Sequence, residues 1–198
     1  MPDSAIGRAQ RRRAVAVAGH TGDVAVAREA LGDADATVRA TALGALGRLG
    51  GLTATELATA LGDSSPHVRR RAALVAATNA GGDLRALLAD DDHLVAEAAA
   101  WALGERNDEG AVPLLIDMTT SHNEPLCREA AVAALGAIGD PTALPAILAA
   151  CSDKPAIRRR AVLALAPFDG ADVEAAIDKA LTDRDWQVRQ AAEDLRRP

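Results

Sequence analysis

Apolar and small residues recur along this chain in a pattern that returns about every thirty positions. In the stretches 38–47 and 127–136, apolar residues occupy the first position and the positions +4, +7 and +8 after it, which form one face of an α-helix. Copies of the pattern begin at Ala9, Val38, Val68, Val95, Cys127, Ile157 and Val188. A repeat of this length indicates units that bury their apolar faces against their neighbours.

A shorter amphipathic segment precedes most copies of this helix. These segments span residues 57–61, 84–88, 112–116, 144–148 and 173–181, and nothing in the pattern indicates a β-strand. We therefore expect one all-α domain over residues 1–198, made of an N-terminal capping helix and six helix pairs. The expected boundaries are 1–22 for the cap and 23–50, 51–80, 81–107, 108–139, 140–168 and 169–198 for the pairs.

Residues that start and stop helices agree with this division. Thr53 and Glu56 form the sequence pattern of a capping box at the start of a first helix. The second helices are expected to begin near Pro66, Pro125 and Pro155, because a proline in the first turn loses no helical hydrogen bond. Their expected C-terminal stops are Gly47, Gly50, Gly104, Gly136 and Gly139.

An aspartate and an arginine recur at a spacing of six residues. The pairs are Asp33 with Arg39, Asp63 with Arg69, and Asp183 with Arg189. An aspartate in a turn and a guanidinium on the next helix can hydrogen-bond within and between repeats, so we expect an Asp–Arg ladder that also includes Arg128 and Arg158. We expect an interruption where Ala96 replaces the arginine and where residues 121–123 contain no aspartate.

This combination of helix pairs and Asp–Arg spacing resembles the HEAT repeat, in particular the short bacterial form known from phycobilisome-lyase subunits. The stretches that carry the resemblance are LGDSSPHVRRRA (61–72), VAEAAAWALGE (95–105), CREAAVAALGAIGD (127–140) and DWQVRQAAEDL (185–195). It covers about residues 23–198, and residues 5–18 look like half a unit that caps the N-terminal end. The resemblance implies a right-handed α–α superhelix in which the second helices line a concave, binding face.

Composition and charge narrow the expected class of protein. Aromatic residues are 2% of the 198 residues, so alanine and leucine must fill the core. The net charge is −6, but residues 83–153 alone carry −10, which predicts an acidic middle for the superhelix. Two cysteines form no disulfide framework, and no segment has the length of a membrane span or the apolar stretch of a secretory signal, so we expect a cytoplasmic protein.

On the second helices, positions +2, +6 and +10 are expected to face the groove. The predicted partner-binding residues are Arg70, Glu97, Trp101, Glu105, Glu129 and Arg159. A tryptophan among carboxylates suits a basic, partly apolar peptide, so we predict a non-catalytic scaffold or adaptor for a protein or peptide with a basic segment. The alternative for Trp101 is that it only covers small residues of neighbouring helices.

Other functions have weaker support in the sequence. Glu97 and Glu129 could form a carboxylate pair, but no nucleophile with an adjacent base is evident, and we predict no catalytic residue. His67, His93 and His122 lie in successive turns, and the chain lacks the His-Glu pairs that bind iron in some HEAT proteins, so we predict neither a metal nor another cofactor.

Two further alternatives stay open. One is a lyase-like or ligand-binding subunit that acts on a small molecule or chromophore. The other is nucleic-acid binding through the arginine triplets at 11–13, 69–71 and 158–160, which the acidic middle of the chain opposes. A polar C-terminal unit favours a monomer, because it suits a terminal cap.

Overall fold

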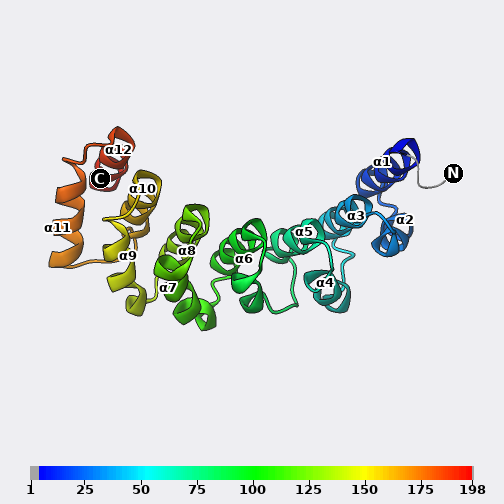
Figure 1. The fold of residues 1–198 in the computed structure, drawn as a ribbon, viewed down its shortest axis with the longest axis horizontal. Coiled ribbons are helices and arrows are strands. Elements are labelled where there is room, and N and C mark those ends of the chain that lie inside the picture. Colours follow the sequence, from blue (N-terminus) through cyan, green and yellow to red (C-terminus); the bar gives the residue numbers. More distant parts are fainter. Residues whose placement is uncertain (1–4, 198) are drawn as a thin grey trace. The chain divides into compact units, whose positions relative to one another are not determined.

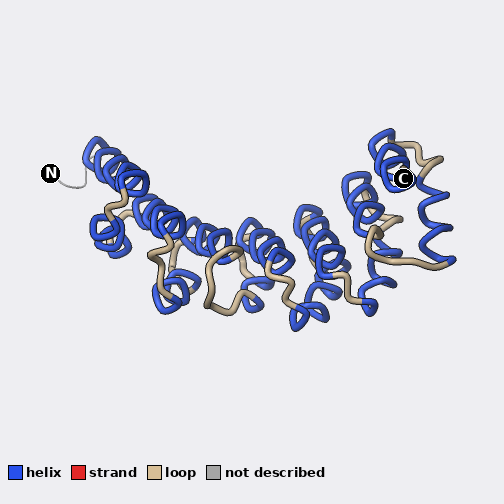
Figure 2. The backbone as a smooth tube through the Cα atoms, turned by 180° about the vertical axis from the view of Figure 1, so that it is seen from behind, coloured by secondary structure: helices blue, strands red, loops and turns tan. Residues whose placement is uncertain are grey.

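The computed structural model describes residues 5–197, and every regular element within that range is helical (Figure 2). The chain divides into two compact units, Met1–Leu87 and Leu88–Pro198, which we call unit 1 and unit 2. The prediction of an all-α fold built from helix pairs is confirmed. The ends of the predicted cap and of the last repeat, residues 1–4 and 198, lie outside the described residues.

Unit 1 has two layers of helices (Figure 1). One layer consists of three helices packed side by side, and the other consists of two short helices that pack on α3 and α5. The elements are α1 (Ala5–Thr21), α2 (Val24–Glu29), the 3₁₀ helix η1 (Ala30–Gly32), α3 (Ala36–Leu49), α4 (Ala54–Leu61) and α5 (Pro66–Ala76), of which α1, α3 and α5 form the first layer.

Unit 2 repeats this two-layer arrangement. The second helices α6, α8, α10 and α12 pack in succession, and the first helices α7, α9 and α11 each pack on the second helix that follows them. The bounds are α6 (His93–Glu105), η3 (Glu109–Ala111), α7 (Val112–Ser121), α8 (Pro125–Ile138), η4 (Pro141–Ala143), α9 (Leu144–Ala150), α10 (Pro155–Ala164), α11 (Ala171–Ala180) and α12 (Trp186–Arg196).

The third repeat has a 3₁₀ helix, η2 (Arg85–Ala89), in place of a first α-helix. Gly81 and Gly82 precede it with left-handed φ angles of 103° and 71°, and the next second helix begins at His93. Between this glycine pair and α6, residues 83–92 contain η2 as their only helical element. Leu84, directly before η2, is nevertheless buried as a first helix requires.

The predicted helix starts are confirmed. Thr53 and Glu56 form a complete capping box at α4, and prolines open α5, α8 and α10. Aspartates that sequence reasoning had not assigned as caps open three second helices: the side chains of Asp35, Asp92 and Asp185 accept hydrogen bonds from backbone N–H groups of α3, α6 and α12.

The predicted stops separate into two groups. Gly50 and Gly139 end α3 and α8 with left-handed φ angles of 64° and 70°, as expected of C-terminal glycines. The other three lie inside their helices, so their prediction as stops is wrong: these are Gly47, Gly104 and Gly136.

These internal glycines set the spacing of adjacent second helices. A Cβ atom on Gly104 would lie 2.8 Å from the Cα atom of Ala134, and one on Gly136 would lie 2.6 Å from that of Ala164. Glycine at +9 therefore lets the next helix, with a small residue at +7, approach almost to backbone contact. This close packing explains a core made largely of alanine, leucine and valine.

No helix among residues 5–197 is long and apolar enough to cross a membrane.

Candidate functional site

A cleft with a volume of about 380 Å³ lies on the second helices α6, α8 and α10 of unit 2. Its charged and large apolar lining residues are Glu97, Trp101 and Glu105 from α6, Leu126 and Glu129 from α8, and Arg160 from α10. Alanines of α8 and Gly104 of α6 complete the lining. The cleft is therefore a furrow with small residues between two helices, with larger side chains along it.

Helical periodicity places the α6 residues together. Glu97, Trp101 and Glu105 follow one another at intervals of four residues, so they lie along one face of the helix. Trp101 keeps 40% of its surface exposed, and Leu126 keeps 43%. The cleft thus presents apolar surface beside carboxylates.

The three carboxylates of the cleft differ in their surroundings. The Oε1 atom of Glu129 lies 3.5 Å from Nη2 of Arg160 and 3.7 Å from Nη2 of Arg159, and its side chain is only 19% exposed. Glu97 and Glu105 form no ion pair with any residue in the range 5–197. The negative charge that can meet a ligand is therefore that of the two α6 glutamates.

The structure brings together four of the six predicted groove residues. Arg159 contacts Glu129 but does not line the cleft, and Arg70 lies in unit 1, where it lines a different hollow with Arg48 and Arg71. Sequence reasoning missed Leu126, at position −1, and Arg160, at +3. Position +3 is 100° around the helix from +2 and faces the preceding second helix, so the +2, +6, +10 rule excluded it.

The two thiols of the chain are held in the protonated form. Burial, followed by the nearby charges of Glu97 and Glu124, raises the pKa of Cys127 to about 11, and its Sγ–H donates a hydrogen bond to the carbonyl oxygen of His93 at 3.1 Å. Burial also raises the pKa of Cys151 to about 11. Neither thiol is a ready nucleophile at neutral pH.

His67, His93 and His122 belong to separate turns and helix starts. His67 belongs to unit 1, His93 opens α6, and His122 follows α7. In the part of the chain that the structure describes, no group of three or more His, Cys, Asp or Glu side chains is arranged to hold a metal ion.

Asp–Arg rungs join successive repeats. In each rung the arginine Nε and Nη2 atoms donate to the two carboxylate oxygens of an aspartate in the next turn, at 2.7–3.2 Å. The rungs within the units are Arg11–Asp33, Arg39–Asp63, Arg128–Asp153 and Arg158–Asp183. Such bidentate pairs fix geometry as well as charge.

A second contact ties each arginine to the turn before its own helix. The Nη1 atoms of Arg39, Arg69 and Arg189 donate to the backbone carbonyl oxygens of Asp33, Asp63 and Asp183, which lie six residues earlier. The six-residue spacing thus reports a contact to the backbone, whereas the aspartate side chain receives the arginine of the preceding repeat.

Sequence reasoning missed two members of these rungs, Arg11 and Asp153. Arg11 and Gly19 of α1 make the contacts that Arg39 and Gly47 make in α3, so the first copy begins at Gln10 and not at Ala9. Asp153 precedes Arg158 by five residues, and the six-residue rule therefore passed over it.

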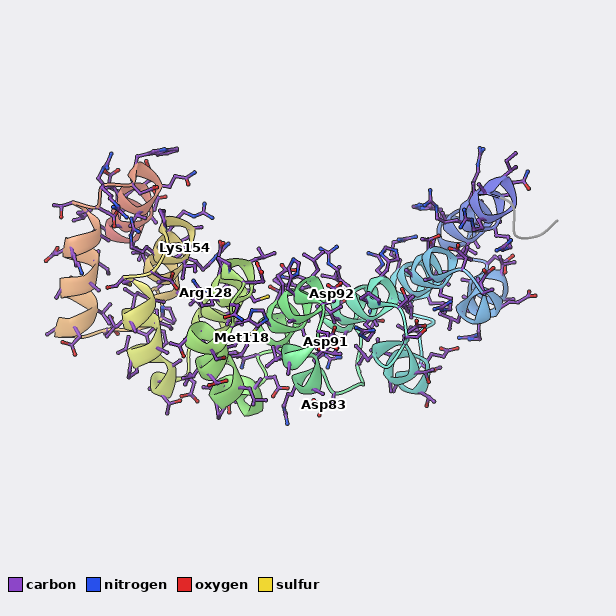
Figure 3. The ribbon with its side chains drawn as sticks, in the orientation of Figure 1. Asp83, Asp91, Asp92, Met118, Arg128 and Lys154 are labelled. Carbon is purple, nitrogen blue, oxygen red and sulfur yellow. The ribbon has the colours of Figure 1, made fainter. Side chains whose placement is uncertain are left out.

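The rung between α6 and the turn before α8 is absent because both of its partners are replaced. Ala96 occupies the arginine position on α6, and His122 occupies the aspartate position. His122 still fills the local role of the aspartate: its Nδ1 atom accepts from the N–H of Glu124, and its carbonyl oxygen accepts from Arg128 (labelled in Figure 3, on α8 beside α10). The turn is kept and only the link between repeats is lost.

Carboxylates of the rungs are more acidic than usual. The hydrogen bonds from their arginine partners, partly opposed by burial, lower the pKa values of Asp33, Asp63, Asp153 and Asp183. The rungs are therefore ionised at neutral pH.

Comparison with known proteins agrees with this repeat architecture. Residues 83–166 match the family model of HEAT repeats. Human deoxyhypusine hydroxylase is 42% identical over 69 residues, which cover 34% of this chain and 22% of that protein. The match thus spans about a fifth of the length of this curated relative.

Solved structures with similar folds span most of the chain. The complex of CpcE and CpcF of phycocyanin lyase from Nostoc sp. PCC7120 is similar with a TM-score of 0.66 and 25% identity, covering 85% of this chain and 74% of that one. A designed armadillo repeat protein in complex with the peptide (KR)4 gives a TM-score of 0.64 at 18% identity, covering 85% and 96%. The helix pairs, their recurring Asp–Arg contacts and these matches identify the chain as a HEAT-repeat protein.

Proposed function

We propose that the cleft of unit 2 is a docking site for a basic peptide segment with a central apolar side chain, and that the protein is a non-catalytic scaffold or adaptor. The observation that carries this proposal is the face of α6, on which two glutamates without ion pairs flank a half-exposed tryptophan. An aromatic anchor beside carboxylates suits the apolar stem and the charged head of lysine or arginine.

The spacing on α6 suggests a register for the peptide. Glu97 and Glu105 are eight residues apart, or about 12 Å along the helix, and Trp101 lies about 6 Å from each. In an extended peptide, alternate residues on one side are about 7 Å apart. A segment that lies along the furrow would therefore present basic residues at its first and fifth positions to the glutamates and an apolar third residue to Trp101.

Glu129, the carboxylate of the cleft that lies beside two arginines, has a different role in this proposal. Glu129 is already close to Arg159 and Arg160, so it fixes the position of Arg160 at the end of the cleft. A guanidinium there would repel a third basic residue and could donate hydrogen bonds to a backbone carbonyl oxygen or an acidic side chain of the partner. The proposal thus predicts a short basic motif and not a long polybasic tract.

A likeness of fold gives further support. The designed armadillo protein with a similar fold was solved with a (KR)4 peptide, so stacked helix repeats can present a surface to a basic peptide. The likeness concerns the fold alone, and the residues of the α6 face are the argument specific to this chain.

The test measures binding of a fluorescently labelled Gly-Lys-Ala-Leu-Ala-Lys-Gly peptide by anisotropy. We expect Trp101→Ala to weaken binding about 30-fold, as loss of an aromatic anchor does. The double variant Glu97→Gln, Glu105→Gln should weaken it about tenfold, since exposed charge contacts contribute about 0.5–1 kcal/mol each. Glu193→Gln, which removes one negative charge at an exposed position on α12, should leave binding unchanged.

Two results would reject the proposal. One is the absence of saturable binding of this peptide to the wild-type chain. The other is an equal loss of affinity in Glu193→Gln and in the α6 variants, which would indicate attraction to the net charge and not to the cleft. Trp101 fluorescence in a Trp186→Phe background offers an independent readout, because Trp186 is the more exposed tryptophan.

A lyase-like role with a chromophore is the second candidate, favoured by the likeness to the phycocyanin lyase subunits at 25% identity. Its test is the visible absorption of the purified chain after incubation with a bilin. Nucleic-acid binding has less support, because Arg11 and Arg158 belong to rungs and Arg159 and Arg160 lie beside Glu129.

A further inference from the structure

Unit 1 contains a hollow of about 390 Å³ on the second-helix layer whose charged lining is entirely basic. Its polar lining residues are His20 from α1, Thr41 and Arg48 from α3, and His67, Arg70 and Arg71 from α5. A shallower hollow of about 200 Å³ adjoins it and shares Arg48 and Arg71. Among residues 5–197, no carboxylate lines either hollow.

Two glycines leave space for the two central guanidinium groups, those of Arg48 and Arg71. A Cβ atom on Gly44 of α3 would collide with the guanidinium of Arg71, and one on Gly19 of α1 would lie 2.7 Å from Nη2 of Arg48. Both arginines thus extend across a neighbouring helix at the point where that helix has no side chain. Arg71 is partly buried there, and Arg48 is exposed.

These arginines lack the counter-charges that four other arginines of unit 1 have. Arg8, Arg11, Arg28 and Arg39 are paired with Asp35, Asp33, Glu56 and Asp63. By contrast, Arg48, Arg70 and Arg71 form no ion pair with any residue in the range 5–197, and the buried Nε atom of Arg70 has no hydrogen-bond partner there.

The electrostatic cost of this arrangement is visible at Arg71. Burial, together with the charge of the neighbouring Arg48, lowers the pKa of the Arg71 guanidinium. Like charges held close together without a counter-ion destabilise each other, and an anion between them would relieve that repulsion. An anion bound between these guanidinium groups would therefore stabilise unit 1.

We propose that this hollow binds a small phosphoryl compound with two or more negative charges, such as a pyrophosphate group. Guanidinium groups match phosphate oxygens with two parallel hydrogen bonds, and Thr41 and the two histidines supply further donors at the rim. The three arginines together carry more positive charge than a single carboxylate could neutralise, which favours a ligand with two or more negative charges. The described lining holds no aromatic side chain other than the two histidines, so nothing in it favours stacking of exposed bases.

The test is isothermal titration of the full chain with sodium pyrophosphate at low ionic strength. We expect saturable binding of one pyrophosphate per chain, weakened about tenfold in Arg48→Gln and in Arg71→Gln. Arg12→Gln removes the same charge from an exposed position on α1 and should bind as the wild type does. Thermal unfolding should shift upward with pyrophosphate in the wild type and in Arg12→Gln only.

Gly44→Ala separates geometry from charge. It keeps every arginine but displaces the Arg71 guanidinium, so pyrophosphate affinity should fall about tenfold while the net charge is unchanged. Absence of saturable binding to the wild type, or an equal loss in Arg12→Gln, would overturn the proposal. Circular dichroism of each variant verifies that α1, α3 and α5 are still folded, and sulfate in place of pyrophosphate measures how far charge alone accounts for binding.

This proposal does not depend on the peptide cleft. The residues concerned belong to different units, and each test has its own ligand and its own control variant.

Discussion

Equivalent positions of the second helices carry opposite charges in the two units. In the helices that line the two hollows, positions +2 and +10 supply arginines in unit 1 and glutamates in unit 2, and position +3 supplies an arginine in both, Arg71 and Arg160. Position +6 is a glycine on α3 and a tryptophan on α6. The other residues are Arg70, Arg48 and Gly44 in unit 1, and Glu97, Glu129, Glu105 and Trp101 in unit 2.

The two units nevertheless share one construction. Positions 0, +4, +7 and +8 are buried in the internal second helices of both, α3 and α5 in unit 1 and α6, α8 and α10 in unit 2. Two Asp–Arg rungs join repeats within each unit. One face of each second helix thus determines the fold, and in our proposals the other face determines the ligand. The proposals therefore imply that a few substitutions on the exposed face, and none in the core, would change the class of ligand.

The largest predicted effect is a loss of stability on acidification, because the four rungs within the units are lost together. The pKa values of their aspartates lie below the usual 3.8, so the folded state favours the ionised form of each carboxyl group. The stability they contribute is fully present above the ordinary aspartate pKa and is lost as pH falls through the lowered values. Urea unfolding between pH 7 and pH 3 should therefore show a nearly level midpoint that drops at the acidic end. A midpoint that rises on acidification would contradict the role of the rungs.

Two arginines of α10, Arg158 and Arg160, separate the structural face from the proposed binding face. Arg158 is 8% exposed in its rung with Asp183, so Arg158→Ala should lower the free energy of unfolding by about 3 kcal/mol. Arg160 is 38% exposed beside Glu129, and Arg160→Ala should cost less than about 1 kcal/mol. Urea unfolding at pH 7 measures both. Equal losses would show that the two faces are not distinct.

Reversal of charge in the cleft tests whether the charge of the α6 face determines peptide binding. The variant Glu97→Arg, Glu105→Arg gives α6 the basic character of the unit 1 face, and it should weaken binding of the Lys-Ala-Leu-Ala-Lys motif by about 2 kcal/mol or more. Its unfolding midpoint should stay close to that of the wild type, because neither glutamate forms an ion pair within residues 5–197. A large loss of stability would show that these glutamates stabilise the fold.

The smallest predicted effect concerns the missing rung. Ala96→Arg and His122→Asp each introduce a charge without its partner, and the double variant restores the rung that the other repeats have. A double-mutant cycle on the free energy of unfolding should give a favourable coupling of about 1 kcal/mol. A coupling near zero would mean that this junction cannot accept the rung geometry.

Much of this architecture could be predicted from the sequence because helical periodicity is local. The apolar positions 0, +4, +7 and +8 indicated the second helices, and the four-residue intervals of Glu97, Trp101 and Glu105 indicated their common face. Caps such as Thr53 with Glu56 depend on a few neighbouring residues, and they were predicted correctly as well.

Contacts between repeats could not be predicted in the same way. Whether Arg160 or Arg159 enters the cleft depends on the direction from which α8 packs on α10, which no single helix encodes. The role of Gly104 and Gly136 depends likewise on the approach of the next helix, and sequence reasoning took them for stops. The unpaired arginines of unit 1 became visible only when the carboxylates of the other arginines were assigned.

The most direct test of the account is a crossed titration of the same four proteins with two ligands. The wild type, Glu97→Gln with Glu105→Gln, Arg48→Gln with Arg71→Gln, and Arg12→Gln would each be titrated with the Gly-Lys-Ala-Leu-Ala-Lys-Gly peptide and with pyrophosphate. The account predicts that the glutamate variant loses only the peptide, the arginine variant loses only pyrophosphate, and Arg12→Gln loses neither. If each variant instead changes both affinities in proportion to its net charge, the two faces are not separate sites and the central claim is wrong.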